Sequence, residues 1–433
     1  MAGDDEKREA PTRRDYVKYG GAVIGGSLLA GCSAGGDSES ATTTAETSAE
    51  TTTETEERAE TETETTTEES TDTATMEPVG RVELESVPES FVGGWGFEAD
   101  VMTALGQSDK IVAAEGPQFW FTGFYDKLPG VSAPDPDSLD RVLTEDWAVK
   151  KEFLYELDPD LLATDPNRFI SYYGSDETEI EELHDNIAPF FGNVSRRKRG
   201  GEWPNWPDGQ SYPYYSIPEF VSRYGDLFQV SERAAALNEF YRTAMEEMRS
   251  RVPSKSEQPT VDVLNARNNP ETDGGFTVYD PDTGLENTYG KKHYRDMEIL
   301  DAFDGEYGGQ TSIQVDYEAL LEADPEILIF HFGVNYRDWN GKDATQATVE
   351  GLRDSPLGQE LTAVQEDNLY IGGTPYQGPI INLFQTEMLG KQLYPDQFGE
   401  WPGDVTDDRL PDVPEEEQLF DRDELADIIT GSN

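Results

Sequence analysis

The sequence predicts an α/β fold in which a single long α-helix joins two lobes. Three observations carry this prediction. Short β-rich runs alternate with helical patterns from about residue 80 onward, which favours helices layered on mostly parallel sheets. A helix–Asp-Pro–strand unit occurs twice, beginning at Glu152 and at Glu318. The strongest helical pattern in the chain, residues 231–252, lies between these two copies.

The first 31 residues have the pattern of an export signal. Arg13 and Arg14 resemble the twin-arginine export motif, and a short Gly-rich apolar stretch follows at residues 19–30. Leu29-Ala30-Gly31-Cys32 then resembles a lipobox, in which the cysteine sulfur carries lipid. We therefore expect residues 1–31 to be a twin-arginine lipoprotein signal. The mature chain would start at Cys32 and be anchored to the outer face of the cell membrane, here the archaeal cell surface.

Residues 32–79 are expected to form a disordered tether between this anchor and the folded part. Thr and Glu dominate residues 37–77 and aromatic residues are absent, so the segment cannot bury enough apolar surface to fold. Cys32 is the only cysteine in the chain, which excludes an intramolecular disulfide and a zinc site built from several thiolates.

The charge of the chain is strongly negative. Its 433 residues include 89 Asp and Glu but 33 Lys and Arg, a net charge of −56. Such a charge argues against nucleic acid and anionic lipid as partners of the polypeptide itself. The acids run through the segments that look folded, where their repulsion opposes a compact state unless salt screens it. The composition indicates adaptation to high salt in the style of haloarchaeal proteins; an acidic mesophilic protein is the alternative.

Each predicted element follows from a local pattern. The runs that read as strands are residues 110–115, 160–165, 260–266, 327–333 and 368–373. The helical patterns are residues 97–105, 146–157, 289–303, 317–323 and 380–393. We expect an N-terminal α/β lobe at residues 80–225, a linking helix at 226–253 and a C-terminal α/β lobe at 254–433.

The repeated unit supports two similar lobes. Six of twelve positions are identical between the segments that begin at Glu152 and Glu318. In each copy a proline, Pro159 or Pro325, ends the helix and a buried strand follows. A long helix between two such lobes would resist wide hinge motion.

Taken in order, these features resemble substrate-binding lipoproteins of ABC importers that bind ferric siderophores, cobalamin or haem. This is the class III, helical-backbone type of periplasmic binding protein, here in a haloarchaeal form. The resemblance covers roughly residues 80–400 and includes Leu105-Gly106, residues 361–371 and Tyr394-Pro395. It implies two Rossmann-like lobes, a monomer, no resident cofactor, and an ABC permease and its ATPase as partners.

The resemblance also implies a ligand and a docking role. The ligand would be an Fe(III) chelate, preferably a hydroxamate-type siderophore; cobalamin, haem or direct binding of Zn, Mn or Fe ions are the alternatives. Glu152 and Glu318 occupy equal positions, seven residues before a proline. In the resembled family, a Glu at this place in each lobe pairs with arginines of the permease. The alternative is a pair of ordinary exposed helix glutamates.

Candidate ligand-binding residues follow the predicted strands. In open α/β sheets ligands bind beyond the carboxyl ends of the strands, and in a two-lobed protein those ends face each other across a cleft. Aromatic and Arg residues recur there and supply apolar area and forked hydrogen-bond donors. These candidates are Trp95, Trp120, Arg168, Arg267, Tyr336, Arg337, Trp339 and Tyr376. The basic cluster at residues 196–199 could attract an anionic ligand to the cleft; a surface loop neutralised by nearby acids is the alternative.

Other classes of function are disfavoured. From residue 80 onward, where the chain looks folded, there is no Gly-x-Ser-x-Gly, Gly-x-x-x-x-Gly-Lys or His-Glu-x-x-His motif, so we do not expect an enzyme. Direct metal binding would require His293 and His331 to converge with a ligand from the N-terminal lobe, while His184 is expected to be exposed. The repeated lobes argue against an adhesin or structural lipoprotein.

Overall fold

The computed structural model describes residues 72–194, 196, 212–268, 275–282, 289–335, 343–405, 407 and 410–432. All of these belong to one compact unit, Glu68–Asn433. The predicted signal residues Arg13 and Arg14 and the predicted lipidation site Cys32 lie outside the described residues. Within the described ranges, no helix combines the length and apolar character that crossing a membrane requires.

The described chain begins with a β-hairpin, where the sequence predicted tether up to residue 79. β1 (Asp72–Met76) pairs antiparallel with β2 (Gly80–Leu84). Ala74 and Met76 alternate with threonines and are buried, and β1 packs against α6 (Ile217–Leu227). The predicted tether is therefore wrong for residues 72–79, because this period-2 pattern buries one apolar face of a strand.

The first sheet is parallel throughout, as the alternation of strands and helices predicted. Its strand order is β5–β4–β3–β6. The strands are β3 (Phe91–Gly93), β4 (Ile111–Ala114), β5 (Asp140–Arg141) and β6 (Leu161–Ala163). Beside α6, its helices are α2 (Gly96–Ala104), α3 (Lys151–Leu157), α4 (Pro166–Tyr173) and α5 (Glu177–Asn186). Short 3-10 turns are η2 (Ser108–Lys110), η3 (Pro117–Phe119), η4 (Tyr125–Lys127) and η5 (Pro136–Ser138).

The second sheet has the order β10–β8–β7–β11–β12, with β9 also paired to β7. Strands β7, β11, β12 and β9 are mutually parallel where they pair, whereas β8 and β10 are antiparallel additions. The strands are β7 (Thr260–Asn265), β8 (Phe276–Tyr279), β9 (Leu300–Asp301), β10 (Ser312–Val315), β11 (Ile327–His331) and β12 (Leu369–Ile371). The helices after η6 (Lys255–Glu257) are α9 (Lys292–Asp296), α10 (Tyr317–Ala323), α12 (Asp343–Asp354), α13 (Thr362–Gln365), α14 (Pro379–Leu393), α15 (Pro395–Phe398) and α16 (Arg422–Thr430), with η7 (Gly358–Glu360) and η8 (Glu415–Glu417).

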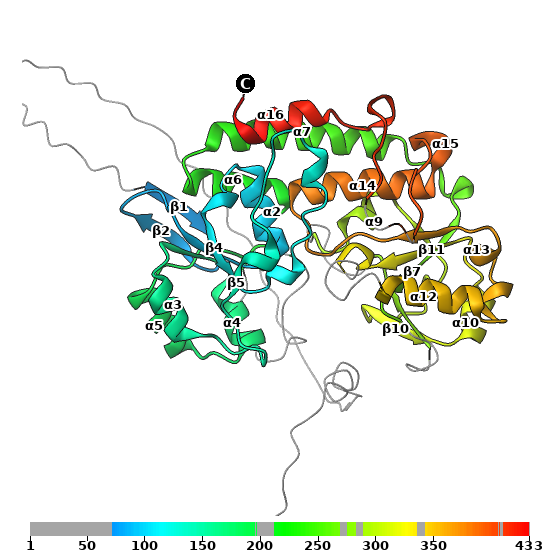
Figure 1. Ribbon diagram of the computed structural model, residues 1–433, viewed down its shortest axis with the longest axis horizontal. Coiled ribbons are helices and arrows are strands. Elements are labelled where there is room, and N and C mark those ends of the chain that lie inside the picture. Colours follow the sequence, from blue (N-terminus) through cyan, green and yellow to red (C-terminus); the bar gives the residue numbers. More distant parts are fainter. Residues whose placement is uncertain are drawn as a thin grey trace, which may run out of the picture. The chain divides into compact units, whose positions relative to one another are not determined.

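Helices α7, α14 and α16 lie along one side of both sheets (Figure 1). α7 (Ser231–Ser250) follows α6 in the chain and packs against α6, α14 and α16. The C-terminal segment returns to the first half of the chain: Lys127 Nζ lies 2.6 Å from an Asp412 carboxylate oxygen and 3.1 Å from the Leu410 carbonyl oxygen. The chain therefore crosses between the two sheets again after α14, which the sequence did not indicate.

The repeated unit is a repeated structure. α3 and α10 each have seven residues and end at an aspartate in the left-handed region, Asp158 (φ 46°) and Asp324 (φ 39°). Each is followed by a proline and then by a strand that is buried along its whole length, β6 or β11.

Two predicted helices are shorter in the structure. Residues 146–150 form a turn in which Trp147 has φ 66° and Leu143 bridges Val149, so the helix begins only at Lys151. The predicted helix 289–303 is wrong in its second half: Glu298 has φ 47°, and β9 then pairs with β7. A left-handed residue breaks the helix in both cases.

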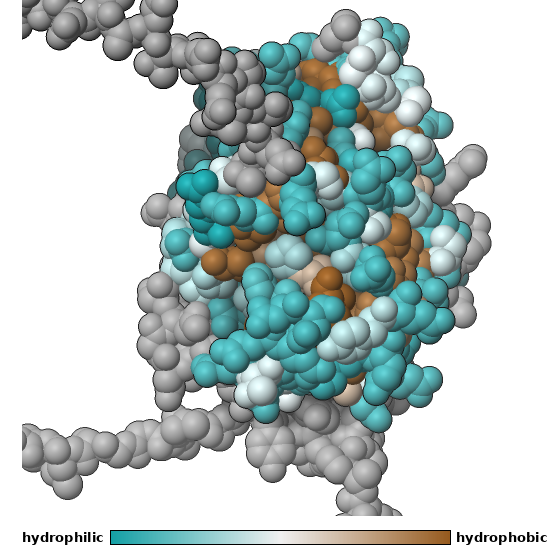
Figure 2. Space-filling view, turned by 90° about the vertical axis from the view of Figure 1, so that its left-hand side faces the viewer, coloured by the Kyte–Doolittle hydropathy of each residue, from teal (hydrophilic) through white to brown (hydrophobic). Residues whose placement is uncertain are grey.

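The surface is mostly hydrophilic. Figure 2 shows one face on which hydrophobic residues form small separate patches in a hydrophilic surround. This pattern fits the acid-rich composition, because carboxylates occupy most solvent-facing positions.

Candidate functional site

Aromatic side chains at the carboxyl ends of both sheets contact one another. Trp95 follows β3, Phe119 follows β4 and Tyr376 follows β12. The Trp95 and Tyr376 ring centroids lie 5.3 Å apart, and those of Phe119 and Tyr376 lie 4.8 Å apart with nearly stacked planes. Tyr376 is 7% exposed. We call this contact between the two sheets the aromatic seam; it lies where a ligand of an open α/β sheet is expected.

The seam continues along the first sheet. The Trp95 ring lies 5.2 Å from Phe119 and 5.7 Å from Tyr172 of α4. Phe119 also stacks on Trp147, with centroids 6.1 Å apart. Trp95, Phe119, Trp147 and Tyr172 are all partly exposed, so they present aromatic faces at the surface.

Arg196 places a cation in the seam. Its guanidinium carbon lies 5.3 Å from the Trp95 ring and 4.8 Å from the Tyr376 ring. Its carbonyl oxygen accepts a hydrogen bond from the Gly290 N–H, 3.1 Å away. Burial lowers the pKa of Arg196, but the phenol oxygens of Tyr376 and other tyrosines outweigh this effect and raise the pKa overall. Arg196 takes part in none of the ion pairs between described residues. Its guanidinium contacts aromatic rings and no carboxylate among those residues.

A second guanidinium borders the seam. Arg141 lies over the Trp147 ring at 4.3 Å, and its Nε donates to the Glu115 carbonyl oxygen at 3.3 Å. One terminal nitrogen of Arg141 is buried and has no hydrogen-bond partner within the described ranges. Burial lowers the pKa of this guanidinium. The seam therefore has an arginine at each end, Arg141 beside Trp147 and Arg196 beside Tyr376.

Arg168 is a buried residue that contacts the Trp95 side of the aromatic seam. It is buried and pairs with Glu98 and with Glu115, the latter at 3.3 Å. Its guanidinium lies 5.1 Å from the Trp95 ring. The indole N–H of Trp95 donates to the Tyr173 hydroxyl at 3.0 Å, and that hydroxyl donates to Glu115 at 2.5 Å. The Trp95 indole is thus held at its N–H by Tyr173 and on its ring by Arg168, both of which belong to a buried network.

Trp120 lies in a neighbouring buried network. It is 5% exposed, and its indole N–H donates to the Tyr125 hydroxyl at 2.8 Å. Tyr125 in turn donates to the Asp100 carboxylate at 2.8 Å. Trp120 also lines a cavity of about 650 Å³, together with Phe121, Lys127 and Asn335. The cavity joins a loop after β4 to a residue after β11, so it too lies at the carboxyl ends of both sheets.

The predicted binding residues thus have different environments. The structure brings Trp95, Arg168 and Tyr376 into contact and places Trp120 at the adjacent cavity. Arg267 is exposed just after β7, where its backbone N–H donates to Asn265. The predicted residues Tyr336, Arg337 and Trp339 lie outside the described residues.

Several seam residues were not among the predicted candidates. Arg141 follows a strand of two residues, which is too short to give a sequence signal. Trp147 lies in a turn with a left-handed residue, where the sequence predicts a helix. Arg196 belongs to the basic cluster that the sequence did identify. Including this cluster among the candidate ligand-binding residues would have identified Arg196.

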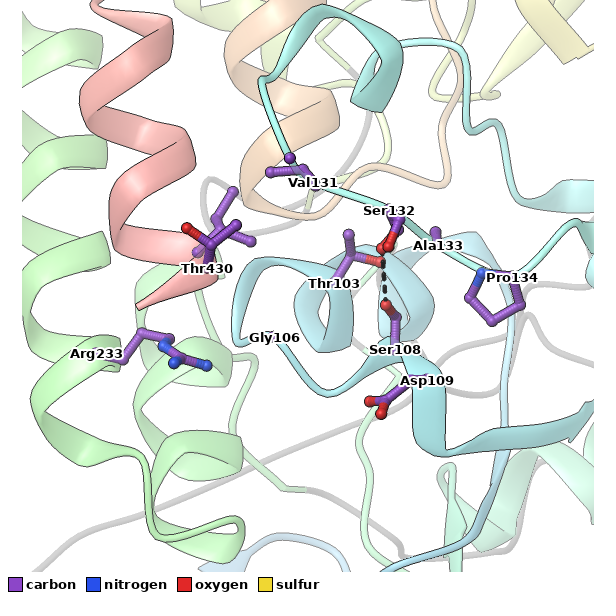
Figure 3. A pocket seen from close by; sticks show the side chains of 12 residues that line it. Thr103, Gly106, Ser108, Asp109, Val131, Ser132, Ala133, Pro134, Arg233 and Thr430 are labelled. Atoms are coloured by element: carbon purple, nitrogen blue, oxygen red, sulfur yellow. Dashed lines mark hydrogen bonds between the residues drawn. The ribbon is translucent and has the colours of Figure 1, made fainter. Parts of the chain in front are cut away.

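A separate cavity of about 600 Å³ lies between α2, α7 and α16. Figure 3 shows Ser108 donating to the Ser132 carbonyl oxygen, with Arg233 and Thr430 on the opposite side. Ser108 precedes β4, so this cavity lies toward the amino end of that strand. Its position is opposite to the edge where a ligand of the sheet is expected.

The histidines do not converge on a metal-binding arrangement. His184 is exposed on α5, whereas His293 and His331 are buried in the second half of the chain. Burial lowers the pKa of His293 to about 3, and the Tyr294 hydroxyl lies 2.9 Å from His331 Nδ1. Among the described residues, no group of three or more His, Cys, Asp or Glu side chains has an arrangement that could hold a metal ion.

Glu152 and Glu318 occupy matching places. Each is the second residue of its helix, α3 or α10, and each is exposed. The repeat therefore presents one carboxylate from each half of the chain.

One family model matches most of the described chain. The periplasmic binding protein family matches residues 96–376. A periplasmic solute-binding protein of Veillonella parvula is 16% identical, with a TM-score of 0.50 over 76% of this chain and 88% of that one. CeuE of Helicobacter pylori, crystallised with Ni(II), is 14% identical, with a TM-score of 0.47 over 75% of this chain and 90% of that one. An ABC-type Fe3+-hydroxamate transport protein of Saccharomonospora viridis is 17% identical, with a TM-score of 0.45 over 72% and 95%. No curated protein matches the sequence.

Proposed function

The chain belongs to the periplasmic binding protein family, a class of solute-binding proteins, and from this premise we propose that it is the substrate-binding lipoprotein of an ABC importer. It captures an iron chelate outside the cell and delivers it to a permease and its ATPase. The observation that carries this proposal is the aromatic seam, where Trp95 and Tyr376 from opposite sheets enclose the Arg196 guanidinium. Fold alone would not identify a ligand class, so the proposal rests on this chemistry.

The preferred ligand is a ferric siderophore of the hydroxamate type. Such a chelate presents oxygen atoms around the metal and apolar linkers at its periphery. Arg196 and Arg141 can donate to the oxygens, while Trp95, Phe119 and Trp147 supply apolar area. Haem and cobalamin offer a flat apolar face and anionic groups, and they are the alternatives for the same site.

Delivery requires a membrane anchor and a docking surface. We assign the anchor to lipid on Cys32 after export directed by Arg13 and Arg14. Glu152 and Glu318 are assigned to contacts with the permease, because the repeat presents them equivalently from α3 and α10. One carboxylate on each half would let two permease subunits engage the protein together.

Ligand binding is tested by quenching of tryptophan fluorescence in high salt. The panel contains ferric hydroxamates, ferric catecholates, haem, cobalamin, and bare Zn²⁺ or Fe³⁺. We expect saturable binding of a ferric hydroxamate, weakened at least tenfold by Arg196→Gln because a charged donor is lost. The control is Arg251→Gln, which removes the partly exposed arginine at the C-cap of α7 that pairs with Glu247. Saturable binding of bare ions alone would refute the chelate proposal.

Permease docking is tested separately by uptake. Glu152→Ala with Glu318→Ala should leave chelate binding unchanged and abolish most transport by cells that express the importer. Glu156→Ala with Glu322→Ala is the matched control, since these exposed glutamates lie on the same two helices. Equal loss of uptake in both double variants would show that the position of the charge is irrelevant.

A further inference from the structure

A cationic cavity lies away from the aromatic seam. Its volume is about 410 Å³, and its walls come from the start of α6, from α7 and from α9. Four of its lining residues are cationic (Arg242, Arg249, Lys292 and Arg295), and Asp296 is the one acid among them; Arg242 is itself paired with Glu239 and Glu246 outside the lining. The excess of cationic over acidic residues in this lining is the reverse of the charge of the whole chain, in which acids outnumber bases 89 to 33.

One carboxylate serves two of these cations. The Asp296 Oδ1 atom lies 2.8 Å from an Arg249 guanidinium nitrogen, and its Oδ2 atom lies 2.5 Å from Lys292 Nζ. The Lys292 and Asp296 side chains are only 14% and 10% exposed. The triad therefore keeps one positive charge more than its single carboxylate can balance; Lys292 and Asp296 are shielded from water, whereas the Arg249 side chain is 44% exposed.

The electrostatics of Lys292 reflect this surplus. Burial lowers its pKa, Asp296 raises it, and the neighbouring Arg249 and Arg295 lower it further. Burial also lowers the pKa of Arg295. Cations that repel one another in a shielded cavity are stabilised by an anion that enters it.

Much of the remaining wall is apolar. Lys292 Nζ lies 5.8 Å from the centroid of the Tyr241 ring, and Met245 lies next to that ring on α7. Tyr241 is itself buried and hydrogen-bonds Asn382 of α14. By contrast, the cavity beside Trp120 is lined by four aspartates and one lysine, so concave surfaces of this protein are not generally cationic.

We propose that this cavity is a binding site for a small tetrahedral oxyanion of the phosphate or sulfate class. The Arg249 fork and the Lys292 ammonium would donate to its oxygens, because guanidinium and ammonium groups form their strongest hydrogen bonds with such anions. A bound oxyanion would connect α7 to α9. Since the next residues on α9, His293 and Tyr294, pack in the core under α14 and beside His331, the site is linked to the core of the second sheet.

The test uses the full chain without any chelate, in 2 M KCl at pH 7.5. Inorganic phosphate, sulfate and glycerol phosphate are titrated separately while thermal unfolding is followed, with KCl adjusted to keep the ionic strength constant. We expect the unfolding midpoint to rise saturably with phosphate or sulfate. A response to glycerol phosphate as well would indicate that an organic phosphate monoester fits. The absence of a saturable rise with all three anions would overturn the proposal.

Variants locate the site. Lys292→Met and Arg249→Gln should each weaken the apparent affinity at least tenfold, whereas Arg251→Gln, at the C-cap of α7 and outside the cavity, should not change it. Equilibrium dialysis of radiolabelled phosphate gives a second readout if Lys292→Met unfolds early, with Lys292→Arg as the variant that keeps the charge and the binding. Unchanged affinity in both Lys292→Met and Arg249→Gln would refute this location. Because no chelate is present, these outcomes are independent of the proposed transport function.

Discussion

Asp100 illustrates how a single residue joins the two halves of the chain. It lies on α2 and is fully buried, yet one carboxylate oxygen accepts from the Tyr125 hydroxyl at 2.8 Å and the other from the Ile381 N–H at 3.1 Å. Ile381 is in the first turn of α14, so Asp100 neutralises the partial positive charge at that helix start. Through Tyr125 the same carboxylate is connected to Trp120 at the cavity wall.

The ionisation of Asp100 should make stability depend on pH. Burial raises its pKa to about 7, although the hydrogen bonds from Tyr125 and the α14 backbone lower it. In the unfolded chain the pKa is about 3.9, so between these values the native state binds an extra proton and stability falls as pH rises. From pH 5 to pH 8 this group should contribute a loss of about 2–3 kcal/mol. Asp100→Asn should remove that part of the loss, as measured by urea unfolding at each pH.

The Asp100→Asn variant is necessary because other buried acids also have raised pKa values and contribute to the same pH dependence. Burial also raises the pKa of Asp301 to about 6 and that of Asp262 well above its usual value. The exposed Asp146→Asn serves as the control and should keep the wild-type pH profile. Parallel profiles for wild type and Asp100→Asn would show that Asp100 does not titrate in this range.

Single residues were the hardest part of the site to predict. The sequence identified Arg168 as a ligand contact, but it cannot show that Arg168 pairs with Glu98 and Glu115, which are 70 and 53 positions away in the chain. Tyr376 was identified because it follows the predicted strand at residues 368–373, whereas Trp95 follows β3, which is not among the predicted strand ranges. The seam between them depends on packing of the two sheets, which has no local signature.

Elements were predicted better than residues, because burial patterns and helix ends are local. Strands β7 and β11 fall within the predicted ranges, and α10 and α14 agree within one residue. The failures occur where a non-glycine residue adopts a left-handed conformation, as at Trp147 and Glu298. Side-chain identity signals such a conformation only weakly outside Gly and Asn, so tertiary contacts determined these ends.

The repeated unit allows a matched test of helix endings. Asp158 and Asp324 both end their helices in the left-handed region, which glycine adopts without steric cost. Asp158→Gly should therefore stabilise the protein by up to about 1 kcal/mol. Asp324→Gly should instead destabilise it by about 1 kcal/mol, because the Asp324 carboxylate accepts from the backbone N–H and hydroxyl of Thr362, both at 2.9 Å.

Both variants are compared with wild type by urea unfolding in the same salt. Asp324→Asn is the companion control, since its amide oxygen retains one acceptor while its conformational preference for the left-handed region stays favourable. The interpretation fails if the two glycine variants change stability in the same direction.

At the scale of the whole molecule, the α/β class and the family resemblance were available from the order of elements, and the family match confirms them. The sequence did not indicate that the C-terminal segment packs against the first half of the chain. Lys127 contacts Leu410 and Asp412, almost 300 positions away, and α16 packs on α7. α16 buries an apolar face that includes Leu425 and Ile429, but a local pattern of this kind does not show which distant element it packs against.

The net charge of −56 leads to a prediction for the whole protein. Folding brings carboxylates closer together, and their repulsion is screened over about 10 Å at 0.1 M salt but about 3 Å at 1 M. Exposed ion pairs such as Arg242–Glu246 contribute little to offset this repulsion. The free energy of unfolding should therefore rise with KCl, with most of the rise below about 1 M, where the screening length changes most.

The measurement is urea unfolding of the full chain from 0.05 to 3 M KCl at pH 7.5. Replacing the exposed Glu415, Glu416 and Glu417 together by glutamine should raise stability at low salt and leave it nearly unchanged at 3 M, because only screened repulsion is removed. A rise that begins only above 2 M would instead indicate general strengthening of apolar burial by salt, and equal effects of the triple variant at both extremes would contradict charge repulsion as its cause.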